Sequence, residues 1–321
     1  MISVVTPVYN EEENVAFFHS EVTKVMETLN DEYEIIYVDD GSRDNTPVLL
    51  HQLASRDPHV HAISFARNFG HQVALTCGLD HAKGDAVITM DGDMQHPPAL
   101  IPLLVEKWKE GYDVVQTVRT STEDAGLIKK ITSAGYYAII NAISDTHITP
   151  GGSDFRLMDR AVADTFLQFR EHSRFIRGIV GGIGYRQTSI AFTAPKRHAG
   201  VSKFSMRKML HFAMDGILTN STLPLRMSFY IGAFSGIAGI LLIFHVLYCN
   251  LTGQTVPGWS TITILLSFFG SLQLVGIGIM GEYIGRIFEE AKGRPLYWIS
   301  WDSAKPVRSA RPTPRKDEGE N

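Results

Sequence analysis

The sequence predicts an α/β domain built on a mostly parallel sheet, followed by amphipathic interfacial helices and a two-helix transmembrane hairpin. Through about residue 120, short apolar runs alternate with helical stretches, which is typical of such a sheet. Further on, residues 229–249 and 262–281 are each about 20 residues long and contain no Lys, Arg, Asp or Glu. Charged residues make up 20% of the 321 residues, and the apolar excess lies in the last third. We therefore expect a soluble domain fused to a membrane segment.

The first 120 residues are expected to supply most of the sheet. Apolar runs predict strands at 2–8, 34–40, 60–65, 85–93 and 113–119, and helical spacing predicts helices at 15–29, 46–55, 71–82 and 100–108. Strands alternating with helices of this length predict a parallel sheet covered on both faces. Ligands of such sheets bind beyond the carboxyl ends of the strands. The polar clusters fall at those ends: Tyr9-Asn10-Glu11, Asp39-Asp40-Gly41-Ser42 and Asp91-Gly92-Asp93.

Residues 121–195 are expected to complete the same domain and to receive an acceptor. They carry a helical pattern at 127–143, a Gly-rich turn at 150–152, a strand-like run at 154–158, another helix and a strand-like run at 185–192. The predicted domain therefore covers residues 1–195.

The two uncharged stretches predict a membrane hairpin at residues 229–285. The connection 250–261 carries no charge, whereas residues 195–226 hold six Lys/Arg against one acid and residues 282–316 hold eight against four. By the positive-inside rule, both ends of the hairpin are expected in the cytoplasm. The alternative is a pair of buried core helices in a soluble protein.

Segments beside the hairpin have their own expected roles. Residues 196–228 should form an acceptor loop and, at 203–218, an amphipathic helix in the headgroup region. Residues 286–300 are expected to be a second juxtamembrane segment, and the Pro-rich, charged tail 301–321 is expected to be disordered.

Composition bounds location and partners. The first residues show no pattern of a cleaved signal peptide. Cys77 and Cys249 lack the spacing of a metal site, and we expect them to pack in the core or the membrane rather than to form a disulfide. These features favour a cytoplasmic catalytic part on an integral protein of the inner (plasma) membrane. With 30 basic and 34 acidic residues, nothing indicates nucleic acid as a partner.

The triplet Asp91-Gly92-Asp93 is the most informative chemical signal. It follows an apolar strand directly and precedes Gln95-His96-Pro97-Pro98. Two carboxylates one residue apart can bind a hard divalent cation that also bridges phosphate oxygens. We expect Asp91 and Asp93 to hold a divalent cation such as Mg²⁺ or Mn²⁺, although an ordinary Asp-rich turn is the alternative.

The ends of the first two strands favour a nucleotide. A carboxylate at a strand end, such as Asp39 or Asp40, can accept hydrogen bonds from a ribose hydroxyl or a pyrimidine N–H, and Tyr9 could flank the base. Turn chemistry alone is the alternative. No Gly-rich dinucleotide or P-loop fingerprint is present, so neither NAD nor ATP is the expected ligand.

Several motifs in order resemble glycosyltransferase family 2, and specifically its polyprenyl-phosphate branch, which includes dolichyl-phosphate mannose synthases and bactoprenol glucosyl transferases. They are VVTPVYNEEENV, IIYVDDGSRDNT, ARNFGHQVAL, DGDMQHPP, GGSDFRLMDR and KRHAGVSKFSMRKML. The likeness covers residues 1 to about 297. It implies a GT-A nucleotide-binding domain, UDP-glucose as the donor, undecaprenyl phosphate as the acceptor and a homo-tetramer.

The resemblance also implies residue roles. The nucleotide would contact a set drawn from the strand ends: Pro7, Tyr9, Glu11, Asp39, Asp40, Arg67 and Asp91. The ion would be held by Asp91, Asp93 and Gln95. The family inverts the anomeric carbon, so the acceptor phosphate attacks opposite the leaving diphosphate through an oxocarbenium-like transition state.

A lipid phosphate is already an anion, so it needs cationic positioning more than proton removal. Arg119, Arg197 and Lys203 are the candidates, against simple attraction to anionic headgroups. Asp154 stands where this branch places a carboxylate proposed as catalytic. It could be a base or could bind a sugar hydroxyl, and the sequence leaves both open.

Two other functions compete with this one. A processive polysaccharide synthase would carry a Gln-x-x-Arg-Trp motif, which precedes none of the four Trp residues. A catalytically idle sugar-nucleotide-binding subunit of a lipid-sugar flippase or assembly complex would bind a donor without transferring it. The intact carboxylates argue against this second alternative. The sequence does not decide the sugar.

Overall fold

The computed structural model describes residues 1–121, 151–172, 174, 176–193, 222–253 and 258–305. The chain divides into two compact units. One contains the sheet together with the segment that begins at Pro295, and the other contains the two long apolar helices. We describe each by itself. The predicted helix at 127–143, the interfacial helix at 203–218 and the tail after residue 305 lie outside the described residues.

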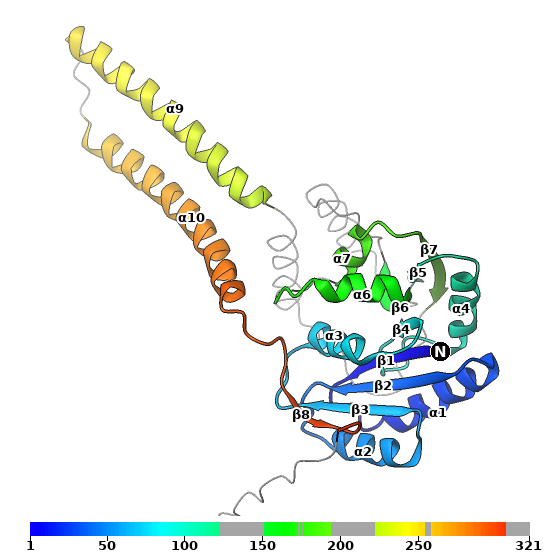
Figure 1. The fold of residues 1–321 in the computed structure, drawn as a ribbon. Helices are drawn as coiled ribbons and strands as arrows, with labels where there is room; N and C mark the ends of the chain where they lie inside the picture. The colour runs from blue at the N-terminus through cyan, green and yellow to red at the C-terminus, as the bar shows by residue number, and fades with distance from the viewer. Residues whose placement is uncertain (122–150, 173, 175, 194–221, 254–257, 306–321) are drawn as a thin grey trace, which may run out of the picture. The chain divides into compact units, whose positions relative to one another are not determined.

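The first unit is built on an eight-stranded mixed sheet in the order β7-β5-β6-β4-β1-β2-β3-β8 (Figure 1). Strands β4, β1, β2 and β3 pair in parallel, β5 and β7 also pair in parallel, and β6 and β8 are antiparallel to their neighbours. The strands are β1 (Ile2–Val8), β2 (Tyr33–Asp39), β3 (Val60–Phe65), β4 (Ala86–Thr89), β5 (Val114–Ser121), β6 (Gly152–Asp159), β7 (Gln187–Thr193) and β8 (Ile299–Asp302). The predicted mostly parallel sheet is thus confirmed, and each predicted strand lies within three residues of its observed position except that β4 ends before Asp91.

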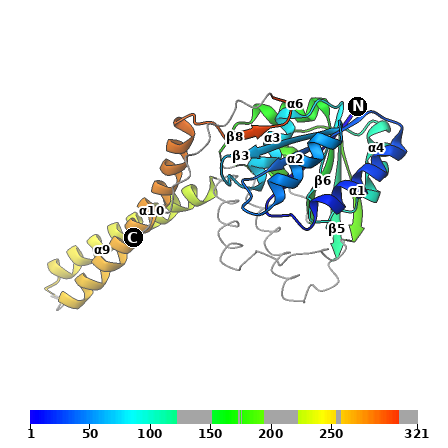
Figure 2. The same cartoon turned by 90° about the horizontal axis from the view of Figure 1, so that it is seen from below.

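Helices cover both faces of the sheet (Figures 1 and 2). They are α1 (Val15–Met26), extended by the short η1 (Glu27–Leu29), then α2 (Thr46–Arg56), α3 (His71–His81), η2 (Pro98–Leu100), α4 (Ile101–Lys109), α6 (Arg160–Gln168) and α7 (Ile176–Gly182). Helix α7 was not predicted, because its IRGIVGG sequence is short and Gly-rich.

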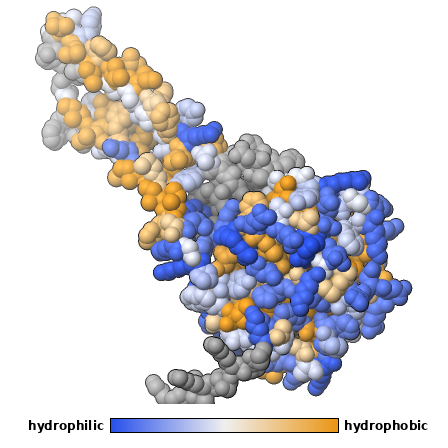
Figure 3. All heavy atoms as spheres, viewed as in Figure 1, coloured by the Kyte–Doolittle hydropathy of each residue, from blue (hydrophilic) through white to orange (hydrophobic). Residues whose placement is uncertain are grey.

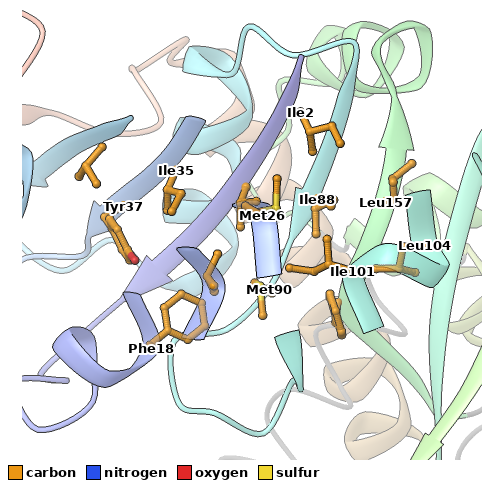
Figure 4. Packing of buried hydrophobic residues seen from close by; sticks show 14 of the residues in the cluster. Ile2, Phe18, Met26, Ile35, Tyr37, Ile88, Met90, Ile101, Leu104 and Leu157 are labelled. Carbon is orange, nitrogen blue, oxygen red and sulfur yellow. The ribbon is translucent and has the colours of Figure 1, made fainter. Parts of the chain in front are cut away.

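Two hydrophobic clusters lie on opposite sides of the sheet. Helices α1 and α4 bury Phe18 and Leu104 in the first cluster (Figure 4). Helix α2 buries Leu50 in the same cluster. Helices α3, α6 and α7 bury their apolar faces in the second. Alternate residues of each strand serve the two sides, since Tyr37 belongs to the first cluster and Val38 to the second. This alternation also decides where the polar residues at the strand ends point.

The chain returns to the sheet after the second long helix. Residues 299–302 form β8 on the open edge of β3. The Trp301 ring stacks on His51 at 3.4 Å between centroids, His61 Nε2 lies 2.8 Å from Asp302 Oδ1, and the Tyr297 hydroxyl donates to Asp80 Oδ2 at 2.8 Å. The expected boundaries, a juxtamembrane segment at 286–300 and a disordered tail from 301, do not anticipate this strand. It also covers an edge that would otherwise be exposed.

Replacing Trp301 with Ala is expected to destabilise the first unit by about 2 kcal/mol, because the ring is half-buried against the first cluster and stacks on His51. Thermal unfolding of the purified chain, followed by tryptophan fluorescence, measures the change. The control is Trp298→Ala, since that side chain is 53% exposed. Equal melting temperatures for the two variants would show that the Trp301 side chain stabilises the unit no more than the exposed Trp298 does.

The second unit consists of α9 (Leu223–Leu251) and α10 (Trp259–Ala291). Both are long and apolar enough to cross a membrane, at Leu223–Cys249 and Ile264–Ala291, and their apolar windows are not buried. Large apolar side chains are exposed along them, including Phe229 and Phe234 (Figure 3). Because core helices of soluble proteins are mostly buried, this exposure supports association with a membrane.

Candidate active site

Asp39 ends β2 and Asp40 follows it, and the two side chains point to opposite sides of the sheet. Asp40 accepts hydrogen bonds from the backbone N–H groups of Phe69 (2.7 Å) and Gly70 (3.0 Å). Asp39 accepts one from the Ser42 N–H (3.0 Å) and lies beside a cavity of about 440 Å³ that Trp301 also lines. Burial raises the pKa of both carboxyl groups, against the hydrogen bonds that lower it. Arg67 lines the same cavity, so the structure places Asp39 beside another of the predicted nucleotide residues.

The loop after β1 is tied to the loop after β2. Asn10 donates from its N–H to Ser42 Oγ (2.9 Å), its side-chain oxygen accepts from the Arg43 N–H (2.8 Å), and the Glu11 N–H donates to Thr46 Oγ1 (2.9 Å). Asn10 has a positive φ of 53°, which Asn tolerates better than most residues. These bonds bring the polar ends of two neighbouring strands together, as their sequence positions predict.

Three of the predicted nucleotide residues sit on β1 and its loop. Pro7 is buried within the strand, opposite Val38 of β2. Tyr9 and Glu11 follow it and are half-buried. The chain therefore passes from the interior of the sheet at Pro7 to the carboxyl end of β1 at Tyr9 and Glu11.

Gly41 lets the β2 and β3 loops approach closely. Its φ is +68°, and a Cβ there would lie 2.4 Å from the backbone carbonyl carbon of Arg67. Any side chain would push the two loops apart. Arg67 itself lies over the rings of Phe69 (4.5 Å) and Trp298 (6.0 Å).

The predicted metal residues lie in one turn after β4. Asp93 Oδ1 accepts from the Gln95 N–H (3.0 Å), and Met94 between them has a φ of +62°. Asp91 Oδ1 is buried and has no hydrogen-bond donor. In the part of the chain that the structure describes, no cluster of three or more His, Cys, Asp or Glu side chains could hold an ion by itself. A hard cation at this turn would therefore need oxygen ligands from a bound substrate as well as those of the protein.

His96 fixes this turn to β6, a role that the sequence did not reveal. Its ring is 4% exposed and stacks on Phe155 at 5.3 Å. Nδ1 accepts from the Asp91 N–H (2.9 Å), so Nε2 must carry the proton that it shares with Ser153 Oγ (2.7 Å). A ring with this tautomer is neutral. The 3.7 Å approach of Nδ1 to Asp91 Oδ2 is therefore not an ion pair.

Asp154 is held by two arginines. Arg177 contacts it through Nε and Nη2 at 3.0 and 3.1 Å, and Arg156, which is 1% exposed, contacts it at 3.2 Å. Burial alone would raise the pKa of Asp154, but the charges and hydrogen bonds of Arg177 and Arg156 hold it well below its ordinary value. A carboxylate this firmly paired is a weak base, so the geometry favours a positioning role over proton removal.

His71 lies between the turn after β4 and Asp154. Its Nε2 is 3.4 Å from Asp91 Oδ1 and 3.8 Å from Asp154 Oδ2. It is the first residue of α3, directly after Gly70. The sequence included His71 in a motif but gave it no role, because one His at the start of a helix carries little signal.

The predicted acceptor residues are only partly placed. Arg119 on β5 donates from Nη2 to Gln95 Oε1 at 3.4 Å, so it lies beside the turn after β4. Arg197 and Lys203 lie outside the described residues. Asp40, Asp91, Asp154, Arg119 and Gln95 thus gather around one edge of the sheet, and His71, His96 and Arg177 join them.

The chain matches a known protein family, and curated relatives match it over nearly its full length. A family profile described as glycosyl transferase family 2 matches residues 3–167. The uncharacterized glycosyltransferase YkcC of Bacillus subtilis (strain 168) is 42% identical over 298 residues, 92% of each chain. The bactoprenol glucosyl transferase of Shigella phage SfV is 40% identical over 305 residues, 95% of this chain and 99% of that one. Coverage this complete includes most of the helical hairpin.

Among solved structures, glucosyl-3-phosphoglycerate synthase from Mycobacterium tuberculosis in complex with Mn²⁺, uridine diphosphate and phosphoglyceric acid matches with a TM-score of 0.46. It is 19% identical, and the match covers 68% of this chain and 76% of that one.

Proposed function

Because this chain belongs to glycosyltransferase family 2, we propose that it transfers glucose from UDP-glucose to a polyprenyl phosphate, with undecaprenyl phosphate as the best candidate. The observation that carries the proposal is the 40% identity to a bactoprenol glucosyl transferase over nearly the whole of both chains. A shared catalytic domain alone would not indicate a lipid acceptor. The likeness extends through the apolar hairpin, which is the part suited to a lipid substrate.

We further propose that Asp91, Asp93 and Gln95 hold Mg²⁺ or Mn²⁺. The bound ion would neutralise charge on the leaving nucleoside diphosphate. The donor-free buried oxygen of Asp91 and the tight turn at Met94 support this assignment. Pro7, Tyr9, Glu11, Asp40 and Arg67 would hold the nucleotide at the neighbouring strand ends. Asp39 belongs to the same proposed set, and the cavity that it shares with Arg67 supports its place there.

In the proposed reaction, an oxygen of the acceptor phosphate forms a bond to the anomeric carbon as the bond to the donor diphosphate breaks. The products are a polyprenyl-phosphate sugar with inverted configuration and a nucleoside diphosphate. Arg119, Arg197 and Lys203 would position the acceptor anion. Asp154 would fix Arg177 and His71 around the reacting groups, since its own proton affinity is low.

The proposed setting is the cytoplasmic face of the inner (plasma) membrane, with the hairpin as anchor and a homo-tetramer as the assembly. The Lys/Arg excess on both flanks of the hairpin supports this orientation. The likeness to bactoprenol glucosyl transferases does not favour the alternative, a catalytically idle flippase subunit, which predicts binding without transfer.

A donor panel tests the proposal. Purified chain in detergent is incubated with undecaprenyl phosphate and radiolabelled UDP-glucose, UDP-galactose, UDP-N-acetylglucosamine or GDP-mannose, and the lipid fraction is counted. We expect label from UDP-glucose and little from the others. Label from another donor would replace glucose in the proposal. Absence of label from every donor, with UDP still bound, would favour the idle subunit.

A further inference from the structure

We propose that His71 is a positioning residue that orients the Asp91 carboxylate for the divalent cation. The inference rests on the proposed metal-dependent transfer. His71 Nε2 approaches Asp91 Oδ1 at 3.4 Å, and that oxygen is buried without a hydrogen-bond donor. His71 is therefore close enough to orient this oxygen, and the oxygen still has lone pairs available for a cation.

His71 also separates two negative charges. The same nitrogen lies 3.8 Å from Asp154 Oδ2, so oxygens of Asp91 and Asp154 both face one imidazole edge. Asp154 stays ionised because two arginines hold it. Without the ring between them, the two carboxylates would repel each other. Among the described contacts, arginines hold Asp154 but not Asp91. Asp91 would therefore be the carboxylate that turns away.

The backbone before His71 fixes its place. Asp40 accepts hydrogen bonds from the Phe69 and Gly70 N–H groups, and Gly70 takes a φ of 101° that starts α3 at His71. The side chain is 41% exposed, so it is not part of the core that holds α3 in place. Packing of the His71 side chain therefore contributes little to the stability of the fold.

The test measures cation binding rather than turnover. The purified full chain is titrated with Mn²⁺ at saturating UDP, and the free ion is followed by electron paramagnetic resonance. His71→Ala is expected to weaken Mn²⁺ binding about 10- to 100-fold, the usual effect of losing an outer partner of a metal ligand. His71→Gln, which keeps a side-chain N–H donor, should recover most of that loss. UDP binding without metal should be unchanged in both.

The matched control is His59→Ala, because His59 is also half-exposed and also contacts a carboxylate, that of Asp57 at 2.8 Å. It should bind Mn²⁺ as the wild type does. Wild-type affinity for Mn²⁺ in His71→Ala would overturn the inference, and so would an equal loss of metal-free UDP binding. A wild-type chain that transfers sugar but binds no Mn²⁺ would overturn both the inference and the metal assignment, and would leave the transfer proposal standing.

Discussion

Replacing Asp154 with Asn is expected to lower the free energy of unfolding by about 3–5 kcal/mol and to remove most sugar transfer. Arg156 is 1% exposed, and burial lowers its pKa to about 10 even with Asp154 beside it. An Asn side chain would leave this buried charge without a carboxylate. Chemical unfolding in detergent, together with the transfer assay at low temperature, separates the loss of stability from the loss of activity.

The control for this change is Asp164→Asn, since Asp164 also pairs with an arginine but is 58% exposed. It should shift stability little. If Asp154→Asn unfolded like the control, the buried ion pair would not stabilise the domain.

Asp154 also predicts a negative result in the pH profile. Its pKa is lowered on folding, so its contribution to stability is present above its unfolded value of about 3.9 and is lost only as pH falls towards the folded value. Between about pH 5 and 8 it stays ionised in both states. Over that pH range, the transfer rate of the wild type should therefore show no change with pH that is absent in the Asp154→Asn variant. Such a change would indicate a proton-transfer role.

Asp93→Ala is expected to reduce transfer on the order of 10²- to 10³-fold, because it removes a carboxylate of the proposed ion site that acts where charge develops on the leaving diphosphate. Asp93 Oδ1 accepts a hydrogen bond from the Gln95 N–H of the same turn. The protein should still fold and insert into membranes. Initial rates at saturating donor, with Mg²⁺ or Mn²⁺, measure the effect.

Asp85→Ala is the matched control, since this carboxylate is 74% exposed and pairs with the chain's amino terminus. It should leave the rate unchanged. Full activity in Asp93→Ala would remove the metal assignment.

The sequence predicted the central strands well, because their apolar runs are bounded by clear turn residues. It missed β8, since a strand of four residues beyond a long apolar helix carries no period that could be recognised. It treated Asp39 and Asp40 alike, although the two-residue period of β2 could have placed them on opposite sides. The carboxylates of the site were found through their motifs. His96 and Arg177 were not, because their roles depend on contacts between β6, α7 and the turn after β4.

The most direct test of the central claim compares two acceptors. Purified chain is incubated with radiolabelled UDP-glucose and either undecaprenyl phosphate or undecaprenol, and the lipid product is identified by mass spectrometry. The account predicts a glucosyl phosphate lipid from the first acceptor and no product from the second. Transfer to undecaprenol, or no lipid product from either acceptor, would contradict it.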